Sequence, residues 1–141
     1  MIDVNMSDCL FCKIASGEID SRCVYCDDYV MAFLDIRPIS RGHLLVIPKK
    51  HSVDLLDMDA EDLQHVFAVV QLMSRAVELA TGADGFNLIV NKGTAAGQVI
   101  FHTHVHLIPR FAGDGLRHWP SIETSDEQLD ELATQIKFSL K

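Results

Sequence analysis

The chain has 141 residues, of which 48% are apolar and 23% charged, and its formal net charge at pH 7 is −8. This size and composition indicate one globular domain with a substantial hydrophobic core. The negative charge argues against non-specific nucleic-acid binding, which needs a basic surface, but allows an anionic small ligand at a local site. No apolar run approaches the roughly 20 residues of a membrane helix, and the N-terminus lacks the features of a secretory signal. We therefore expect a cytoplasmic protein with neither a membrane nor a nucleic acid as partner.

Turn residues and hydrophobic spacing predict the first elements of the fold. Residues 1–6 are expected to form a loose tail, followed by a single domain over residues 7–141. The segment 7–17 carries the start and stop residues of a short helix. Residues 23–34 contain two short β-prone runs separated by the turn Asp27-Asp28, and residues 42–48 form a third predicted strand.

The longest predicted helix begins after Asp59 and ends near Gly82. Its apolar residues follow the spacing of one buried stripe: Leu63, Val66, Phe67, Val70, Met73 and Val77. Residues 85–91 and the histidine-containing run 101–111 are the fourth and fifth predicted strands. A last helix is expected to start at Ser125 with a capping box, and its apolar stripe is Leu129, Leu132, Ala133 and Ile136. Five strands and two main helices indicate an α+β fold with an antiparallel sheet covered on one face.

The run FHTHVHLIPRF, residues 101–111, places His102, His104 and His106 at alternating positions. Residues two apart on a strand point to the same face, so the three imidazoles are expected to share one face. Such an arrangement could chelate zinc at an open catalytic site. Alternatively, the middle ring could attack phosphorus while its neighbours bind phosphate oxygens or protonate the leaving group. The preceding loop NKGTAAGQ, residues 91–98, favours phosphate because its two glycines let the backbone approach a ligand.

These segments resemble those of the histidine triad (HIT) family. The run from His102 to Ile108 is similar to the HIT signature, in which three histidines alternate with apolar residues. The segments CLFCKIASGEI, VMAFLDIRP, GHLLVIPKKH, GFNLIVN and GQVIFHTHVHLIPR also resemble successive HIT segments in the same order, over about residues 7–118. The resemblance implies a five-stranded antiparallel sheet that continues across a homodimer. It also implies an enzyme that cleaves the α-phosphate P–N or P–O bond of a purine nucleoside phosphoramidate or dinucleoside polyphosphate through a covalent nucleotidyl-histidine.

Carried over position by position, the resemblance implies a role for each residue of the site. His104 is the nucleophile and His106 lies beside it against the phosphate. Asn91 is expected to hydrogen-bond the phosphate or the leaving group, and Gln98 with the neighbouring backbone to complete the oxyanion contacts. The implied nucleotide-binding residues are Asp35 at the ribose hydroxyls, Phe11, Phe33 and Ile36 around the base, and Gly97 in the phosphate loop.

Some of these residues also fit ordinary structural roles, and the sequence departs from the family pattern in places. Asp35 could be a turn aspartate, and Phe33 and Ile36 could be core residues. Thr103 stands where an apolar residue is usual, and Val99 stands where one branch of the family carries serine. The ending LIPR is closer to bacterial HIT proteins and to the dinucleoside polyphosphate hydrolases. The sequence therefore does not assign the chain to one branch of the family.

The four cysteines lie as two pairs with CxxC spacing, Cys9 with Cys12 and Cys23 with Cys26. Spacing alone allows a four-cysteine zinc site. However, Cys23 and Cys26 are three apart on a predicted strand and are expected to face opposite sides. The resemblance to bacterial HIT proteins and to galactose-1-phosphate uridylyltransferases implies a different set for a structural zinc, namely Cys9, Cys12, His51 and His102. The alternative is that Cys9 and Cys12 are small buried thiols.

Cys23 and Cys26 are then interpreted as structural, and His43 and His65 as surface or edge residues. Two other functions remain open from the residues. One is a metal-dependent hydrolase that uses the three alternating histidines as ligands. The other is a nucleotide-binding module that binds adenosine monophosphate without turnover.

Overall fold

The computed structural model describes residues 8–140, so the tail expected at residues 1–6 lies outside the described part of the chain. The helices are α1 (Leu10–Ala15), α2 (Ala60–Thr81) and α3 (Asp126–Ser139), with short 3₁₀ turns η2 (Leu55–Asp57) and η3 (Thr94–Ala96). The strands are β1 (Cys23–Cys26), β2 (Val30–Leu34), β3 (Leu44–Pro48), β4 (Gly85–Val90) and β5 (Val105–Arg110). They form one sheet in the order β1-β2-β3-β5-β4, and each neighbouring pair is antiparallel. The predicted five-stranded antiparallel α+β fold is confirmed.

Strand β5 joins the two halves of the sheet, because it pairs with β3 on one side and β4 on the other. The β3–β5 register places Leu45 opposite His106, and the β4–β5 register places Ile89 opposite the same histidine. His106 therefore lies in the middle of the sheet, near the end where the chain enters β5. The β3–β5 register thus places Leu45 and His106 side by side, although about half of the chain separates them in sequence.

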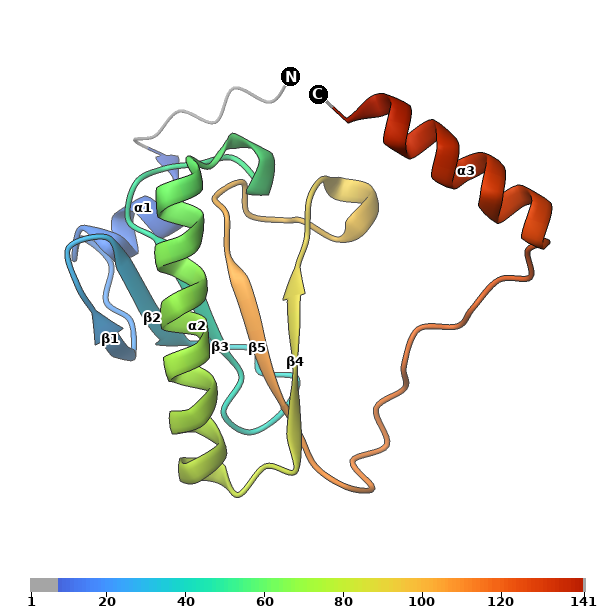
Figure 1. The fold of residues 1–141 in the computed structure, drawn as a ribbon. Coiled ribbons are helices and arrows are strands. Elements are labelled where there is room, and N and C mark those ends of the chain that lie inside the picture. Colours follow the sequence, from blue (N-terminus) through green and yellow to red (C-terminus); the bar gives the residue numbers. More distant parts are fainter. Residues whose placement is uncertain (1–7, 141) are drawn as a thin grey trace.

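Both faces of the sheet carry hydrophobic core. Val105 and Leu107 pack with residues of α2, which covers one face along its length (Figure 1). The opposite face carries a second cluster that contains Phe11 and Ile14 of α1 together with Leu45. The sheet is therefore not covered on one face only, and the histidines lie on the side of the second cluster.

Helix α2 begins and ends where its caps predict. Asp59 precedes it, and Gly82 follows with a φ of 70°, in the left-handed region that ends helices. The buried stripe is shifted from the prediction, because Val69 and Ser74 are buried while Phe67 is 39% exposed. Neither α2 nor any other helix of residues 8–140 is long and apolar enough to cross a membrane.

The last helix, α3, begins after Ser125 as predicted. Ser125 and Gln128 make the reciprocal hydrogen bonds of a capping box. Its apolar stripe is exposed, at 51% for Leu129, 52% for Leu132 and 55% for Ile136. Figure 1 shows α3 standing clear of the sheet at the end of an irregular segment.

Candidate functional site

The three alternating histidines lie where the chain enters β5. Only His106 belongs to the strand, since β5 begins at Val105. The expectation that all three continue one strand face is therefore corrected for His102 and His104. The reason is local: the Thr103 amide donates to the Ser52 carbonyl at 2.8 Å, and the Ser52 hydroxyl donates to the Thr103 hydroxyl at 2.7 Å. These bonds tie the segment to the loop after β3, and they also satisfy the threonine that departs from the family pattern.

His104 is held in one tautomer by the backbone. Its Nδ1 lies 2.7 Å from the carbonyl oxygen of His102. A carbonyl only accepts hydrogen bonds, so Nδ1 carries the hydrogen and Nε2 keeps a free lone pair. The ring is 8% exposed and meets the edge of Phe11 at a centroid distance of 5.1 Å. Burial lowers the pKa of His104, which keeps the imidazole neutral at pH 7.

His106 is oriented by a second histidine, His43. The backbone N–H of Ile39 donates to Nδ1 of His43 at 3.0 Å, so the hydrogen of His43 must reside on Nε2. That Nε2–H donates to Nδ1 of His106, also at 3.0 Å. The remaining nitrogen of His106, Nε2, therefore carries a hydrogen and is a donor. Burial and the neighbouring histidines lower the pKa of His106 to about 4.

His43 is a part of the site that the sequence prediction missed. The interpretation as a surface or edge residue was wrong, because its side chain is only 2% exposed. The available signal was its position directly before β3, a strand whose five residues are all buried. Burial lowers the pKa of His43, while the nearby carboxylate of Asp35 raises it.

Asp35 lies beside this pair of histidines and also stabilises a turn. One carboxylate oxygen, Oδ2, is 3.6 Å from Nε2 of His43. The other, Oδ1, accepts the backbone N–H of Arg37 at 2.8 Å. Asp35 can therefore stabilise the turn through Oδ1 and also act in the site, since Oδ2 stays close to the histidines.

The loop before the histidines places Asn91 next to Gly97. A Cβ atom at Gly97 would lie 3.7 Å from Nδ2 of Asn91, and the φ of Gly97 is +91°, which suits glycine. Gln98 is buried, and its amide donates to the carbonyls of Val53 at 2.7 Å and Ile100 at 3.2 Å. Both amide hydrogens are thus committed, so the side chain of Gln98 has no donor for an oxyanion. We revise its expected role to holding this loop in shape.

The residues expected around the base divide into two kinds. Phe11 and Phe33 are buried and pack edge to face with a centroid distance of 5.6 Å. Ile36, in contrast, is 82% exposed, as is Val99 at 83%. Phe11 therefore contacts the histidines from the core and Phe33 packs behind it, whereas Ile36 is the one of these three expected base contacts that is exposed.

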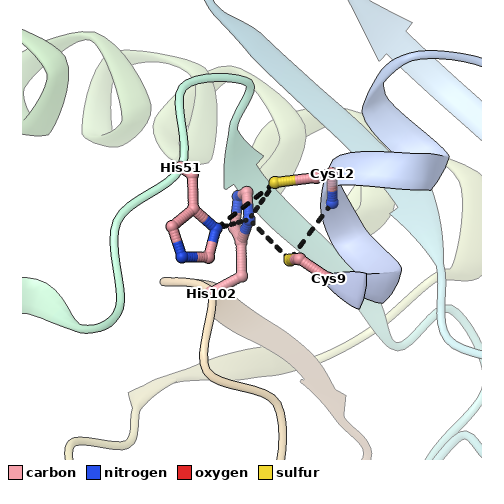
Figure 2. A group of neighbouring side chains, drawn as sticks. All are labelled: Cys9, Cys12, His51 and His102. Carbon is pink, nitrogen blue, oxygen red and sulfur yellow. Dashed lines mark hydrogen bonds between the residues drawn. The ribbon is translucent and has the colours of Figure 1, made fainter. Parts of the chain in front are cut away.

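A second cluster of side chains lies next to His104 and contains Cys9, Cys12, His51 and His102. Figure 2 shows the two thiols of the α1 region facing the two imidazoles. The Nδ1 atom of His102 is 3.3 Å from Sγ of Cys9, 3.5 Å from Sγ of Cys12 and 3.3 Å from Nδ1 of His51. All four donor atoms lie within 4.8 Å of one another, so this quartet could hold a metal ion. The residues are those expected from the sequence.

The hydrogen bonds around the quartet suit metal binding. Nε2 of His102 is 2.7 Å from the carbonyl oxygen of Pro48, so this nitrogen carries the hydrogen and Nδ1 offers its lone pair to the cluster. Burial, and contact with Cys9, raise the pKa of the Cys12 thiol to about 12. Without a cation the thiol would keep its proton, whereas a bound metal ion favours the thiolate.

The other cysteines take no part in this cluster. Cys23 and Cys26 are both exposed on β1, so the interpretation of this pair as structural finds no packing to support it. His65 is also outside the site, and its Nε2 lies 2.9 Å from the carboxylate of Asp27.

Comparison with known proteins agrees with this geometry. The protein-family model described as the HIT domain matches residues 16–113 of this chain. The chain is 45% identical over 130 residues to Adenylylsulfatase HINT3 of Arabidopsis thaliana, a match that covers 92% of this chain and 66% of that protein. It spans about two thirds of the length of this relative.

Two solved structures are also similar over nearly the whole chain. The crystal structure of SMU.412c from Streptococcus mutans is 43% identical with a TM-score of 0.92, covering 100% of this chain and 90% of that one. The crystal structure of a Zn-bound histidine triad family protein from Mycobacterium smegmatis is 40% identical with a TM-score of 0.75, covering 96% of this chain and 100% of that one.

Proposed function

This chain belongs to the HIT family, and from that membership we propose that it is a hydrolase that cleaves the P–N or P–O bond at the α-phosphate of a purine nucleotide. The orientation of His104 carries the proposal. Its Nδ1–H is held by the His102 carbonyl at 2.7 Å, which leaves the Nε2 lone pair free on a buried, neutral ring. A neutral imidazole with a fixed lone pair is a good nucleophile toward phosphorus and a good leaving group afterwards.

The reaction proceeds in two displacements. Nε2 of His104 forms a bond to the α-phosphorus, while the bond from phosphorus to the leaving group breaks and the leaving group departs with the electron pair and takes up a proton from solvent. Water then attacks the phosphorus of the nucleotidyl-histidine, the bond from phosphorus to Nε2 breaks, and the water proton returns to solvent. This step releases the nucleoside monophosphate and restores neutral His104. The Nε2–H of His106, fixed by its bond to His43, donates to a phosphate oxygen as negative charge grows there.

The surrounding residues bind the nucleotide. The Asn91 amide and the backbone around Gly97 face the phosphate, and the Asp35 carboxylate accepts hydrogen bonds from the ribose hydroxyls. Ile36 contacts the base. Phe11 and Phe33, which are buried, form the floor beneath the base and the histidines.

We also propose that Cys9, Cys12, His51 and His102 hold a structural zinc ion. Two thiols and two imidazole nitrogens at these mutual distances fit four-coordinate zinc. The similar protein from Mycobacterium smegmatis is Zn-bound. A closed set of four protein ligands leaves no position for a reacting water, so the ion would link α1, the loop after β3 and the start of the histidine run.

The geometry gives less support to a metal-dependent hydrolase that uses the three alternating histidines. Among the described residues, His102 belongs to the cysteine-containing quartet, and His106 groups with Asp35 and His43. A metal ion bound by Asp35, His43 and His106 would need the lone pair of Nε2 of His43, but this nitrogen carries the hydrogen. The three histidines therefore do not converge on one metal ion.

A homodimer completes the proposal. Strand β4 is one edge of the sheet, and its six residues include neither lysine nor proline to block pairing. The opposite edge, β1, has four residues and an irregular register between Cys23 and Tyr25. We therefore propose that two copies pair through β4.

The test is intact mass spectrometry after rapid quenching of the protein with adenosine 5′-phosphoramidate, for the wild type and His104→Ala. A transient adenylyl adduct in the wild type alone is expected. Unchanged hydrolysis by His104→Ala would contradict the proposed nucleophile. Because the Arabidopsis relative is named an adenylylsulfatase, adenylyl sulfate joins a diadenosine polyphosphate in the substrate panel. AMP binding without an adduct or turnover on any of these substrates would indicate a binding module.

A further inference from the structure

The quartet of Cys9, Cys12, His51 and His102 contains one ring nitrogen whose partner lies outside the quartet. Nε2 of His51 is buried, and among residues 8–140 it is the only buried side-chain nitrogen or oxygen without a hydrogen-bond partner. Figure 2 shows the two nitrogens of this ring on opposite sides, one toward the thiols and the other away from them. Buried polar groups in folded proteins are nearly always hydrogen-bonded, so this nitrogen calls for a partner.

The hydrogen of the His51 ring resides on this outer nitrogen. Nδ1 of His51 lies 3.3 Å from Sγ of Cys12 and 3.3 Å from Nδ1 of His102, so it is the nitrogen that faces the quartet. Its lone pair is used there, either by a bound zinc ion or by the proton of the Cys12 thiol. A neutral imidazole then carries its hydrogen on Nε2. His51 therefore presents a donor on the side away from the quartet.

The other imidazole of the quartet shows what such a nitrogen needs. Nε2 of His102 lies 2.7 Å from the carbonyl oxygen of Pro48. An acceptor behind a metal-binding imidazole fixes the tautomer and the orientation of the ring, and it makes the metal-binding nitrogen more basic. In the described part of the chain, no carbonyl takes this position behind His51. The acceptor of His51 must therefore be reached in another way.

A small hollow lies between the loop after β3 and the start of α2. His51 lines it together with the carboxylates of Asp57, Asp59 and Asp62, whereas the other three residues of the quartet do not. The hollow is therefore on the outer side of the His51 ring. The centre of a water molecule can occupy about 10 Å³ of it, close to the smallest space that holds one water. The hollow thus has room for one bridging water and for no larger ligand.

One of the three carboxylates lacks a hydrogen-bond donor. Asp57 accepts the backbone N–H of Val53 at 2.9 Å. Asp59 pairs with Lys50 and is 67% exposed. Asp62 is less exposed, at 24%, and Nζ of Lys50 stays 3.9 Å from its Oδ2. No other N–H or O–H of residues 8–140 donates to the Asp62 side chain. The hollow thus has a buried donor without an acceptor on one side and a carboxylate without a donor on the other.

We propose that Asp62 is the positioning residue of His51, and that it accepts the Nε2–H of this ring through one buried water molecule. Bridging waters of this kind are nearly as favourable as direct hydrogen bonds. The inference rests on the proposed zinc site, because Asp62 acts by orienting His51 as a zinc ligand and making it more basic. It also connects the first turn of α2 to the quartet, although α2 covers the other face of the sheet.

Zinc competition with a chelating dye tests the role of Asp62. We expect Asp62→Ala to bind zinc at least ~10-fold more weakly than the wild type, since the loss of an outer acceptor typically costs a ligand set this much. The matched control is Glu61→Ala. Glu61 is the other acidic residue in the first turn of α2, but it is exposed and does not line the hollow. Glu61→Ala removes the same charge from the helix N-terminus and should leave zinc affinity within about 3-fold of the wild type. Equal affinities of the two variants would overturn the proposal.

The variant Asp62→Asn separates the hydrogen bond from the charge. Asparagine keeps a side-chain oxygen that accepts from the water, so zinc affinity should return to within about 5-fold of the wild type. A loss as large as that of Asp62→Ala would contradict the hydrogen-bonding role, because it would assign the effect to the charge alone.

Proton exchange at the His51 ring gives a readout separate from zinc affinity. Nitrogen-15 NMR of the zinc-loaded protein is expected to show a slowly exchanging Nε2–H in the wild type and in Glu61→Ala. Exchange should be at least ~10-fold faster in Asp62→Ala, where the water loses its second partner. Equal exchange rates in the three proteins would refute the bridge.

Elemental analysis of the wild type decides the zinc proposal by itself. If the wild type holds no stoichiometric zinc, the zinc proposal and this inference fail together. If it holds zinc and Asp62→Ala binds the ion as tightly, this inference alone fails. The adenylyl adduct on His104 reports separately on the chemistry.

Discussion

The role of His43 leads to the sharpest prediction from this structure. Its two ring nitrogens make different hydrogen bonds: Nδ1 accepts one from the backbone N–H of Ile39, and Nε2–H donates one to Nδ1 of His106, each at 3.0 Å. An asparagine side chain can reproduce the first bond, because its oxygen lies near the position of Nδ1. A glutamine side chain can reproduce the second, because its amide nitrogen reaches the position of Nε2. The pair His43→Asn and His43→Gln therefore separates local structure from orientation of His106.

The magnitude follows from the burial of the pair. His43 is 2% exposed, so Nδ1 of His106 loses its hydrogen-bond partner without gaining water when the donor is removed. An unsatisfied buried group costs about 2 kcal/mol. In the proposed mechanism this loss falls on the orientation of His106, which contacts the phosphate in the transition state, so we expect about 30-fold lower kcat for His43→Asn. KM should change little.

The assay is steady-state hydrolysis of adenosine 5′-phosphoramidate, together with thermal unfolding of each variant. His43→Gln should keep most of the wild-type kcat even where it lowers the stability, because it retains the donor to His106. The reasoning would be refuted if the kcat values of His43→Asn and His43→Gln followed their thermal stabilities and not the presence of a hydrogen-bond donor to His106. A kcat for His43→Asn equal to that of the wild type would also refute it.

Three further predictions concern stability. Because the pKa of His106 is about 4 in the folded chain and its ordinary value is 6.5, the unfolded chain binds more protons between these pH values. The contribution of His106 to the free energy of unfolding should therefore fall, by at most about 3 kcal/mol, as pH falls through this window, and urea titrations should show a smaller total fall for His106→Gln. Cys12→Ser should abolish stoichiometric zinc in elemental analysis and cost several kcal/mol of stability, whereas unchanged zinc content would contradict the quartet. Gly42→Ala should cost about 3 kcal/mol, since its φ is +91° and a Cβ would lie 2.8 Å from Thr81, against about 1 kcal/mol for Gly82→Ala, where a Cβ meets nothing within 4 Å.

Features set by neighbouring residues could be predicted from the sequence. The stop of α2 at Gly82 depends on one left-handed residue, and the start of α3 depends on Ser125 and Gln128 bonding each other. The boundaries of β2, β3 and β4 followed apolar runs and turns for the same reason, whereas β5 begins only at Val105, after the predicted start of its strand. Burial was harder to predict, because Phe67 fits the helical stripe of α2 but is 39% exposed, at a hollow that it lines with Phe86 and Leu88 of β4.

Features set by distant pairing could not be predicted from local pattern. His43 and His106 are 63 residues apart, and only the pairing of β3 with β5 brings them into contact. Before that pairing is known, a histidine next to a strand fits an edge position equally well. The α3 stripe presents the same difficulty in another form. Its periodicity places Leu132 and Ile136 on one apolar side of the helix, but it does not reveal that both are exposed.

The alternation of the three histidines has a physical reason that the structure supplies, because each ring meets a different partner. The carbonyl of Pro48 fixes His102 with its lone pair toward the thiols, and the carbonyl of His102 fixes His104 with its lone pair free. His43 fixes His106 with a hydrogen on its outer nitrogen. His102 therefore belongs to the Cys/His quartet through its side chain and orients His104, the proposed nucleophile, through its backbone. Spacing by two residues is what lets one residue do both, since the ring of His104 folds back on the carbonyl two positions earlier. In the proposed reaction, anchoring of His102 by the quartet would thus set the direction of attack from His104.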